Sequence, residues 1–254
     1  MTTTLIVLAH PAQTSFNAAW ARATEAACRA EGDEVLWSDL YQLGFDPAEC
    51  AAHYAEEIVT EPYDVLKTQE AASKTGNLPA VITEEVEKLR QADRIVFHFP
   101  VWWFAPPAIL KGWCERVLAN GGLHDTSNRF DTGHFRNKPV LFCATTGSKA
   151  SESAHNGKEG DIQMLLWPLA YTLRYLGFDV LVPRIVHGVH GYHKGAARED
   201  LETRLQNEIE GHRETIARFA TLPKISFNAD SEFDRAGTLS LGAPSHSHFI
   251  RHDP

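Results

Sequence analysis

Hydrophobic residues in this chain gather into short continuous runs, and the segments between the runs have helical periodicity. The runs cover residues 5–9, 34–37, 94–99, 138–144 and 178–182. A continuous apolar run of this length is typical of a strand that is covered on both faces. Amphipathic or charged segments predict helices over residues 18–30, 82–91, 107–120, 162–176 and 195–220.

This alternation of strands and helices predicts a doubly wound, three-layer α/β fold. We expect a five-stranded parallel sheet with the strand order 2-1-3-4-5, in which the point where the strand order switches lies between the first and third strands. Ligands of such sheets bind at that switch point, outside the carboxyl ends of the strands. Residues 1–220 are expected to form this domain. Residues 221–254 are a polar extension with too few apolar residues to fold alone, so it trails in solvent or lies on another surface.

Composition and charge disfavour several classes of protein. The chain has 254 residues, 43% of them hydrophobic, and a net charge of −9 without a block of Lys or Arg, so neither nucleic acid nor an anionic membrane is an expected partner. No apolar run is long enough to span a bilayer, and residues 1–5 do not resemble a signal peptide, which predicts a cytoplasmic protein. No metal site is predicted, because the four cysteines and the histidines are scattered.

Three large aromatic side chains crowd the loop after the third predicted strand. Trp102, Trp103 and Phe104 follow Pro100 and Val101 at the carboxyl end of that strand. Burial of one such side chain contributes about 1.5–3 kcal/mol, so exposure of all three without use is costly. A flat aromatic ligand or a neighbouring subunit is therefore expected to cover them.

The loops after the first and fourth predicted strands could bind a phosphate and a ring. Thr14, Ser15 and Asn17 stand at the start of a helix, where hydroxyls and free N–H groups attract anions, although simple helix capping by Thr14 or Ser15 also explains them. In the loop 145–148, Gly147 allows a ligand to approach the backbone, although an ordinary turn would also use glycine. Together the three loops suit a flavin.

These residues resemble the NAD(P)H:quinone oxidoreductases of the DT-diaphorase type, which have a flavodoxin-like fold. The resemblance rests on stretches that run in order along the chain, at residues 10–17, 38–41, 91–93, 99–104, 107–117, 145–147, 160–161 and 166–168. It implies FAD and a two-electron reduction of quinones by NADH or NADPH, with ping-pong hydride transfer through flavin N5. It also implies a homodimer whose catalytic pocket is shared between chains, with the C-terminal extension on the partner or partly disordered.

The resemblance also implies which residues contact the flavin and the substrate. The cofactor contacts would be His10, Thr14, Phe16, Asn17, Ala18, Pro100, Val101, Trp102, Trp103, Phe104, Thr145, Thr146, Gly147, Ser148 and Arg198. The last of these would meet the phosphate on the adenine side. The substrate pocket would contain Phe104, His124, Thr126, Tyr175 and Phe233, the last of them near the partner's pocket.

Two parts of the chain depart from the family pattern. Ser153 and Glu159 stand where larger members carry a Tyr and a His that relay charge to the flavin, and a Glu would repel a reduced flavin. His155 could replace them if the loop shifts, or it could be a solvated loop residue. With Trp103 and Gly147, these three residues form the predicted catalytic set. His124 and Thr126 also replace paired tyrosines of the substrate pocket.

Three other functions compete with quinone reduction. An FMN-dependent azo- or nitroreductase would use the same kind of pocket for its flat acceptors. A flavoprotein subunit that regulates a membrane transporter would need no turnover. A one-electron carrier of the flavodoxin type is disfavoured, because the long aromatic loop and the two insertions predict a pocket rather than an exposed flavin edge.

Overall fold

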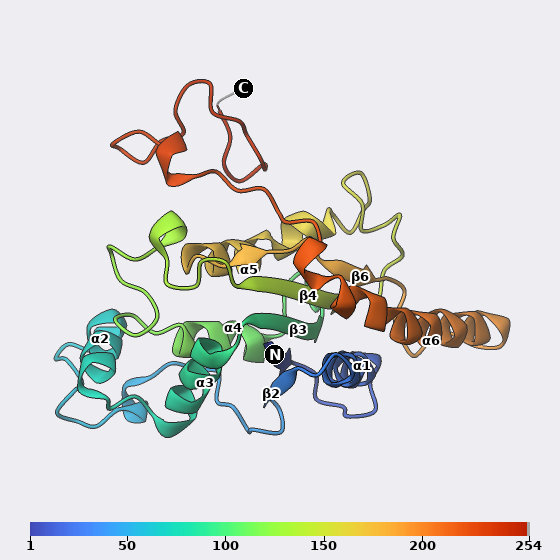
Figure 1. Ribbon diagram of the computed structural model, residues 1–254, viewed down its shortest axis with the longest axis horizontal. Helices are drawn as coiled ribbons and strands as arrows, with labels where there is room; N and C mark the ends of the chain where they lie inside the picture. Colours follow the sequence, from blue (N-terminus) through green and yellow to red (C-terminus); the bar gives the residue numbers. More distant parts are fainter. Residues whose placement is uncertain (253–254) are drawn as a thin grey trace.

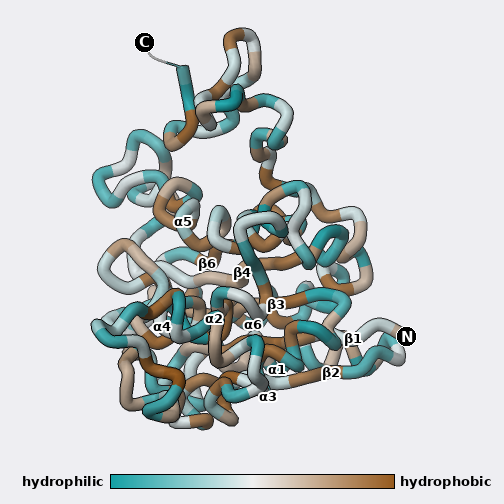
Figure 2. Tube along the Cα trace, turned by 90° about the vertical axis from the view of Figure 1, so that its left-hand side faces the viewer, coloured by the Kyte–Doolittle hydropathy of each residue, from teal (hydrophilic) through white to brown (hydrophobic). Residues whose placement is uncertain are grey.

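A parallel sheet runs through the centre of the computed structural model, which describes residues 1–252 (Figure 1). Its strands are β1 (Thr3–Leu8), β2 (Glu34–Asp39), β3 (Arg94–Pro100), β4 (Pro139–Thr145), β5 (Asp179–Val180) and β6 (Arg184–Val186). The observed order β2-β1-β3-β4-β5 confirms the prediction. The hydrophobic segments of the chain lie along these central strands (Figure 2).

The last predicted strand is shorter than expected, and a further short strand follows it. Residues 178–182 were expected to form one strand, but β5 pairs only with the start of β4, and β6 pairs with its end through Cys143–Arg184, Ala144–Ile185 and Thr145–Val186. Pro183 lies between the two segments and has no N–H group to continue a ladder. As a result the chain leaves β6 directly beside the tip of β4.

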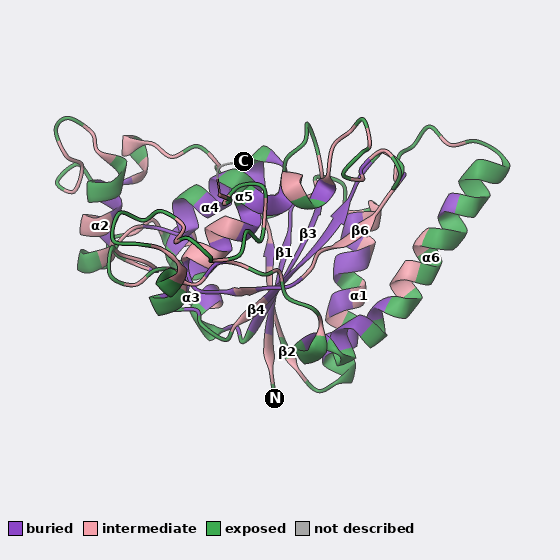
Figure 3. Ribbon diagram, turned by 90° about the horizontal axis from the view of Figure 1, so that it is seen from above, coloured by how far each residue is buried: buried purple, intermediate pink, exposed green. Residues whose placement is uncertain are grey.

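Helices cover both faces of the sheet (Figure 3). One face packs against α1 (Phe16–Ala30) and α6 (Ala196–Ala217), and the other against α3 (Ala80–Gln91), α4 (Ala108–Val117) and α5 (Ile162–Tyr175). The polar excursion at residues 46–80 contains α2 (Val65–Thr75). Short 3-10 turns occur at η1 (Ala51–His53), η2 (Phe130–Thr132), η3 (Phe219–Thr221) and η4 (Asp230–Glu232). Strand side chains alternate between the two apolar layers, as a sheet buried on both faces requires.

The C-terminal segment begins on the sheet and then loops outward beyond α5 (Figure 1). Val182 donates its N–H to Pro223 O at 2.8 Å, and Ile225 donates to Val180 O at 2.8 Å. Further along, the ring of Phe249 stacks on Trp167 with 5.7 Å between centroids. The segment therefore has anchors on its own chain, and its packing on a partner subunit stays a prediction.

Among residues 1–252, no helix combines the length and the apolar character that crossing a bilayer requires.

Candidate functional site

The three loops singled out in the sequence meet at the carboxyl edge of the sheet. Ala9 donates its N–H to His98 O at 2.9 Å, which ties the end of β1 to β3. Val101 donates to Thr145 O at 2.7 Å, which ties the aromatic loop to β4. The buried amide of Asn17 donates to Thr145 Oγ1 at 3.0 Å and so links the start of α1 to the same point. At the switch point predicted from the strand order, hydrogen bonds thus connect the ends of β1, β3 and β4 and the start of α1.

The aromatic loop is a two-residue turn with an uncommon backbone. Trp102 and Ala105 exchange N–H···O hydrogen bonds of 2.9 and 3.1 Å, and between them Trp103 and Phe104 have φ of 50° and 63°. Both values lie in the left-handed region, where turns usually place Asn or Gly and where bulky residues are outliers. The side chains of Trp103 and Phe104 are 93% and 52% exposed. The fold therefore holds two strained residues so that their rings face outward, which is typical of a binding site.

The loop after β1 combines a capped helix with free donors. Ser15 is the N-cap of α1, and its Oγ accepts from Ala18 N–H at 3.2 Å, which confirms the capping interpretation for Ser15. Thr14 is exposed and does not cap the helix. Within residues 1–252 the N–H groups of Phe16 and Asn17 have no hydrogen-bond partner, whereas that of Ala18 is used by Ser15. The two free donors lie at the positive end of the helix dipole, where a phosphate would bind.

This loop also contains a buried amide with an unpaired oxygen, in Asn17, and an uncharged imidazole, in His10. Asn17 is 3% exposed, and its Oδ1 has no partner among the described residues. A buried acceptor of this kind costs about 1–3 kcal/mol unless something donates to it. The ring of His10 lies 5.8 Å from that of Trp102, and burial lowers the pKa of His10, so this ring is neutral near pH 7.

The loop after β4 leaves open space in front of its backbone. The N–H groups of Gly147 and Ser148 have no partner within the described part of the chain. A Cβ atom added at Gly147 would meet nothing within 4 Å, and its φ lies outside the left-handed region. Neither packing nor backbone conformation therefore requires glycine here. A ligand that approaches the two free donors would explain the absence of a side chain.

Sequence reasoning missed a histidine that contacts this loop. His187 follows β6, and its Nδ1 lies 2.9 Å from Thr146 Oγ1. Thr146 Oγ1 is also 3.0 Å from Ser148 O, and Thr146 donates its N–H to Val186 O at 3.0 Å. The sequence carried one usable signal, the apolar pair Ile185-Val186 just before His187, but the fifth strand was expected to end at residue 182.

Of the three predicted relay residues, only Ser153 is bonded to the β4 loop. Ser153 is 4% exposed, and its Oγ lies 2.6 Å from Ser148 Oγ. His155 is exposed and Glu159 is half-buried. Neither side chain forms a hydrogen bond or an ion pair within residues 1–252. The structure therefore does not connect His155 or Glu159 to the candidate flavin site, and their roles stay predictions.

Arg198 lies away from the three loops. It is in the first turn of α6, which starts on the side of the sheet where the strands end (Figure 3). Its Nε donates to Glu202 Oε1 at 2.8 Å, and this carboxylate raises the pKa of Arg198. The predicted contact with a phosphate would require the guanidinium to exchange this partner.

The predicted substrate-pocket residues occupy three places in one chain. His124 and Tyr175 pack edge to face, 5.3 Å between centroids, and line a cavity of about 890 Å³ together with Phe249 of the C-terminal segment. Thr126 and Phe233 line a different cavity of about 370 Å³. Phe104 is on the aromatic turn and lines neither cavity. Neither of these two cavities, in the described part of the chain, is lined by all five residues.

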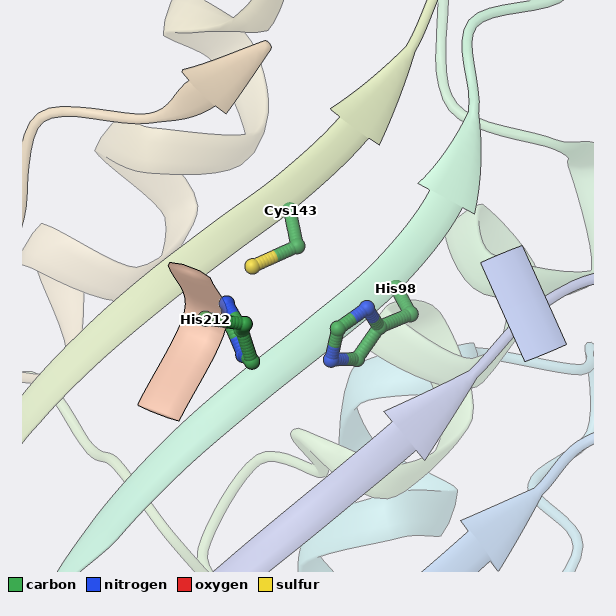
Figure 4. A group of neighbouring side chains, drawn as sticks. All are labelled: His98, Cys143 and His212. Atoms are coloured by element: carbon green, nitrogen blue, oxygen red, sulfur yellow. The ribbon is translucent and has the colours of Figure 1, made fainter. Parts of the chain in front are cut away.

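A buried cluster behind the sheet brings together three side chains that often bind metals. His98 of β3, Cys143 of β4 and His212 of α6 have ligand atoms within 4.8 Å of one another (Figure 4). However, Trp20 Nε1 donates to His212 Nδ1 at 3.0 Å, so Nε2 carries the ring proton and donates to Thr24 Oγ1 at 2.7 Å. Both ring nitrogens of His212 are therefore used in hydrogen bonds, and neither keeps a lone pair for a metal ion. The bonding favours a hydrogen-bonded core network over a metal site.

Comparisons with known proteins point in one direction. The family described as having a flavodoxin-like fold matches residues 2–209. NAD(P)H dehydrogenase [quinone] 1 from Rattus norvegicus is 41% identical over 191 residues, which cover 73% of this chain and 68% of the rat protein. Ribosyldihydronicotinamide dehydrogenase [quinone] from Mus musculus is 38% identical over 192 residues, which cover 73% of this chain and 81% of the mouse protein. A crystal structure of a candidate quinone reductase from Klebsiella pneumoniae superposes with a TM-score of 0.84 at 28% identity, covering 94% of each chain.

Proposed function

Because this chain belongs to the flavodoxin-like family of NAD(P)H:quinone oxidoreductases, as the resemblance in its sequence predicted, we propose that it reduces quinones with electrons from NADH or NADPH. The observation that carries the proposal is the aromatic turn. Trp103 and Phe104 keep exposed rings in a strained backbone at the switch point of the sheet. A protein without a flat ligand at this edge would gain stability by losing both features.

The residues at this edge fit a flavin. The free N–H groups of Phe16 and Asn17 would hold a phosphate, and the rings of Trp103 and Phe104 would lie along the isoalloxazine. Gly147 would leave room for the pyrimidine ring. When bound, the flavin supplies a two-electron acceptor and donor, with hydride passing through N5. We propose FAD, as the resemblance implies, with FMN as the alternative.

The protein's own part in the reaction is to orient and to stabilise charge. The N–H groups of Gly147 and Ser148 would donate to the edge of the ring on which negative charge grows, without any need to reorganise. The exposed ring of Trp103 would define one stacking position, which a nicotinamide and then a quinone would occupy in turn. This single position implies a ping-pong order, and stacking in the correct geometry supplies much of the rate enhancement.

We further propose that the working unit is a homodimer. Phe104 lies apart from the cavity that contains His124 and Tyr175, and the exposed aromatic turn needs a cover. A second copy of the chain could supply both, because in a two-fold interface a residue i of each chain contacts a residue j of the other, so the aromatic turn of each chain could lie on the cavity of its partner. The C-terminal extension would then pack near the partner's pocket.

The direct test is anaerobic. The purified yellow protein is mixed with NADH or NADPH, the flavin absorbance is followed, and the quinone menadione is then added. We expect bleaching followed by recovery, and chromatography after denaturation should identify FAD. A protein that binds neither FAD nor FMN contradicts the proposal, and one that binds flavin without bleaching contradicts the enzymatic part of it. Release of FMN with faster reduction of azo dyes would favour the azoreductase alternative.

A further inference from the structure

His187 is held in one orientation by the turn after β4. A carbonyl oxygen can only accept, so the hydroxyl of Thr146 donates to Ser148 O and leaves its oxygen lone pairs for His187. The Nδ1 of His187 must therefore carry a proton and donate to Thr146 Oγ1. Its other nitrogen, Nε2, then has a free lone pair, and it makes no hydrogen bond within residues 1–252. This assignment of protons follows from the partners.

The surroundings of His187 keep it neutral but accessible. The ring is half-buried, and burial lowers the pKa of His187, with a further lowering by the guanidinium of Arg204 on α6. That guanidinium also donates to His187 O at 3.3 and 3.4 Å and fixes the backbone. On the same loop His190 and His193 stack on each other at 3.9 Å. Within the described chain no carboxylate bonds to the His187 ring. No negative charge in contact with the ring therefore stabilises its protonated form before a ligand brings one.

Within the described residues, His187 is the only titratable side chain hydrogen-bonded to Thr145, Thr146 or Ser148. The other bonded groups, Asn17 and Ser153, do not titrate near neutral pH. Protonation of His187 at Nε2 would leave the Nδ1–H···Thr146 bond in place. The ring can therefore gain a positive charge without disturbing the turn that offers the free N–H groups of Gly147 and Ser148.

We propose that His187 is a positioning residue that takes up a proton from solvent at Nε2 when negative charge develops on a flavin beside the β4 turn, and that it returns this proton when the flavin is reoxidised. The inference rests on the proposed function. It gives this chain a proton acceptor in a different element from Ser153, His155 and Glu159. The electrons come from the nicotinamide, and His187 exchanges only the proton, so the charge balances at each step.

The test compares His187→Gln with the wild-type flavoprotein. The glutamine amide can still donate to Thr146 Oγ1 but cannot be protonated near neutral pH. We expect oxidised flavin to bind within twofold of wild type and reduced flavin to bind about tenfold more weakly, which lowers the two-electron midpoint potential by about 30 mV. Photochemical reduction in weak buffer should consume fewer protons per flavin in this variant. His190→Gln, on the same loop, is the matched control and should behave as wild type.

Each outcome separates this inference from the proposed function. Equal weakening of oxidised and reduced flavin in His187→Gln would show a purely structural role and overturn the inference. An unchanged midpoint potential and unchanged proton uptake would do so as well, while bleaching of the wild-type protein by NADH would leave the proposed function intact. Failure of the wild-type protein to bind any flavin would overturn both.

Discussion

The backbone at Trp103 and Phe104 carries strain that the surrounding bonds must compensate. Each L-residue in the left-handed region costs about 1–2 kcal/mol relative to an ordinary conformation. The paired hydrogen bonds between Trp102 and Ala105 and the tie from Val101 to Thr145 hold the turn in place. The cost is retained because the conformation turns two rings outward at the ligand edge.

Because of this strain, two substitutions of Trp103 should weaken flavin binding alike but differ in their free energy of unfolding. Trp103→Gly and Trp103→Ala both remove the ring, so both should weaken flavin binding and slow turnover by at least tenfold. Glycine suits φ of 50°, and we expect the free energy of unfolding of Trp103→Gly to exceed that of Trp103→Ala by about 0.5–1 kcal/mol, after allowance for the greater chain entropy of glycine. Urea unfolding of the apoproteins measures the difference.

The exposed His155 is the control position for this experiment. His155→Ala should leave the free energy of unfolding unchanged and should reduce turnover much less than the Trp103 variants, since its side chain has no partner in the described chain. If Trp103→Gly were less stable than Trp103→Ala, the turn would not be strained. If all three variants lost the same activity, the roles assigned here would be wrong.

Sequence reasoning at this scale found the residues but not their conformation. The crowding of Trp102, Trp103 and Phe104 after a buried strand was visible in the sequence, and so was Gly147. The left-handed backbone was not, because aromatic residues have no preference for it, and only the fixed ends of the turn impose it. His187 was missed because its contact with Thr146 depends on a three-residue strand, for which the apolar pair Ile185-Val186 is only a short signal.

At the scale of elements, continuous apolar runs predicted most of the strands, and their alternation with helices predicted a doubly wound sheet. Four of the five runs became full strands because buried parallel strands must be apolar on both faces. The fifth run, residues 178–182, formed only the two-residue β5, and β6 follows beyond Pro183, which has no N–H group for a ladder. The tie between α6 and the sheet was also hidden, since it runs through polar atoms of residues far apart in the sequence.

That tie predicts how stability depends on pH. The hydrogen bonds run from Trp20 to His212, to Thr24 and then to His98, and so join α1, α6 and β3. Burial lowers the pKa of His212 to about 3, with a smaller contribution from Arg184. Burial, and then the neighbouring His212, also places the pKa of His98 well below its usual value. Both rings are therefore neutral in the folded protein at pH 5–7.

Unfolded histidines titrate near pH 6.5, so below that pH the unfolded chain binds protons that the folded chain does not. The free energy of unfolding should therefore contain the whole contribution of these two histidines above about pH 6.5. It should fall as the pH is lowered, by up to about 1.4 kcal/mol per pH unit for each histidine. His212→Gln can still accept from Trp20 and donate to Thr24, but it does not titrate. We expect the fall between pH 7.5 and 5.5 to be smaller in this variant by the contribution of His212, with the part due to the other histidines of lowered pKa remaining.

Urea unfolding at the two pH values measures this slope, and His155→Gln serves as the exposed control with the wild-type slope. A His212→Gln protein with an undiminished slope would show that other groups cause the acid sensitivity. Retention of a bound metal by the purified wild-type protein would contradict the assignment of the cluster as a hydrogen-bonded network.

At the scale of the whole molecule, the loops predicted to hold the cofactor meet at one edge of the sheet, whereas four of the predicted substrate residues line two separate cavities. The tips of β1, β3 and β4 converge as their place in the strand order requires, because the carboxyl ends of parallel strands share one edge. The four substrate residues line separate cavities of the described chain, because a resemblance in sequence names residues but does not say where each of them lies in the fold. His124 and Tyr175 line one cavity, while Phe104 stands on the aromatic turn.

A shared pocket predicts that two defective chains can repair one another. If Trp103 of one chain works with His124 of the other, a dimer of Trp103→Ala and His124→Ala chains has one site with both natural residues and one site with neither. Unfolding and refolding an equal mixture should therefore restore roughly a quarter of wild-type turnover, since half of the dimers are mixed and half of their sites are intact. Each variant refolded alone is the control, and light scattering should give about twice the 28.3 kDa mass of one chain. No recovery in a mixture that forms dimers would place both residues in the site of a single chain, and a monomeric wild-type protein would contradict the shared pocket altogether.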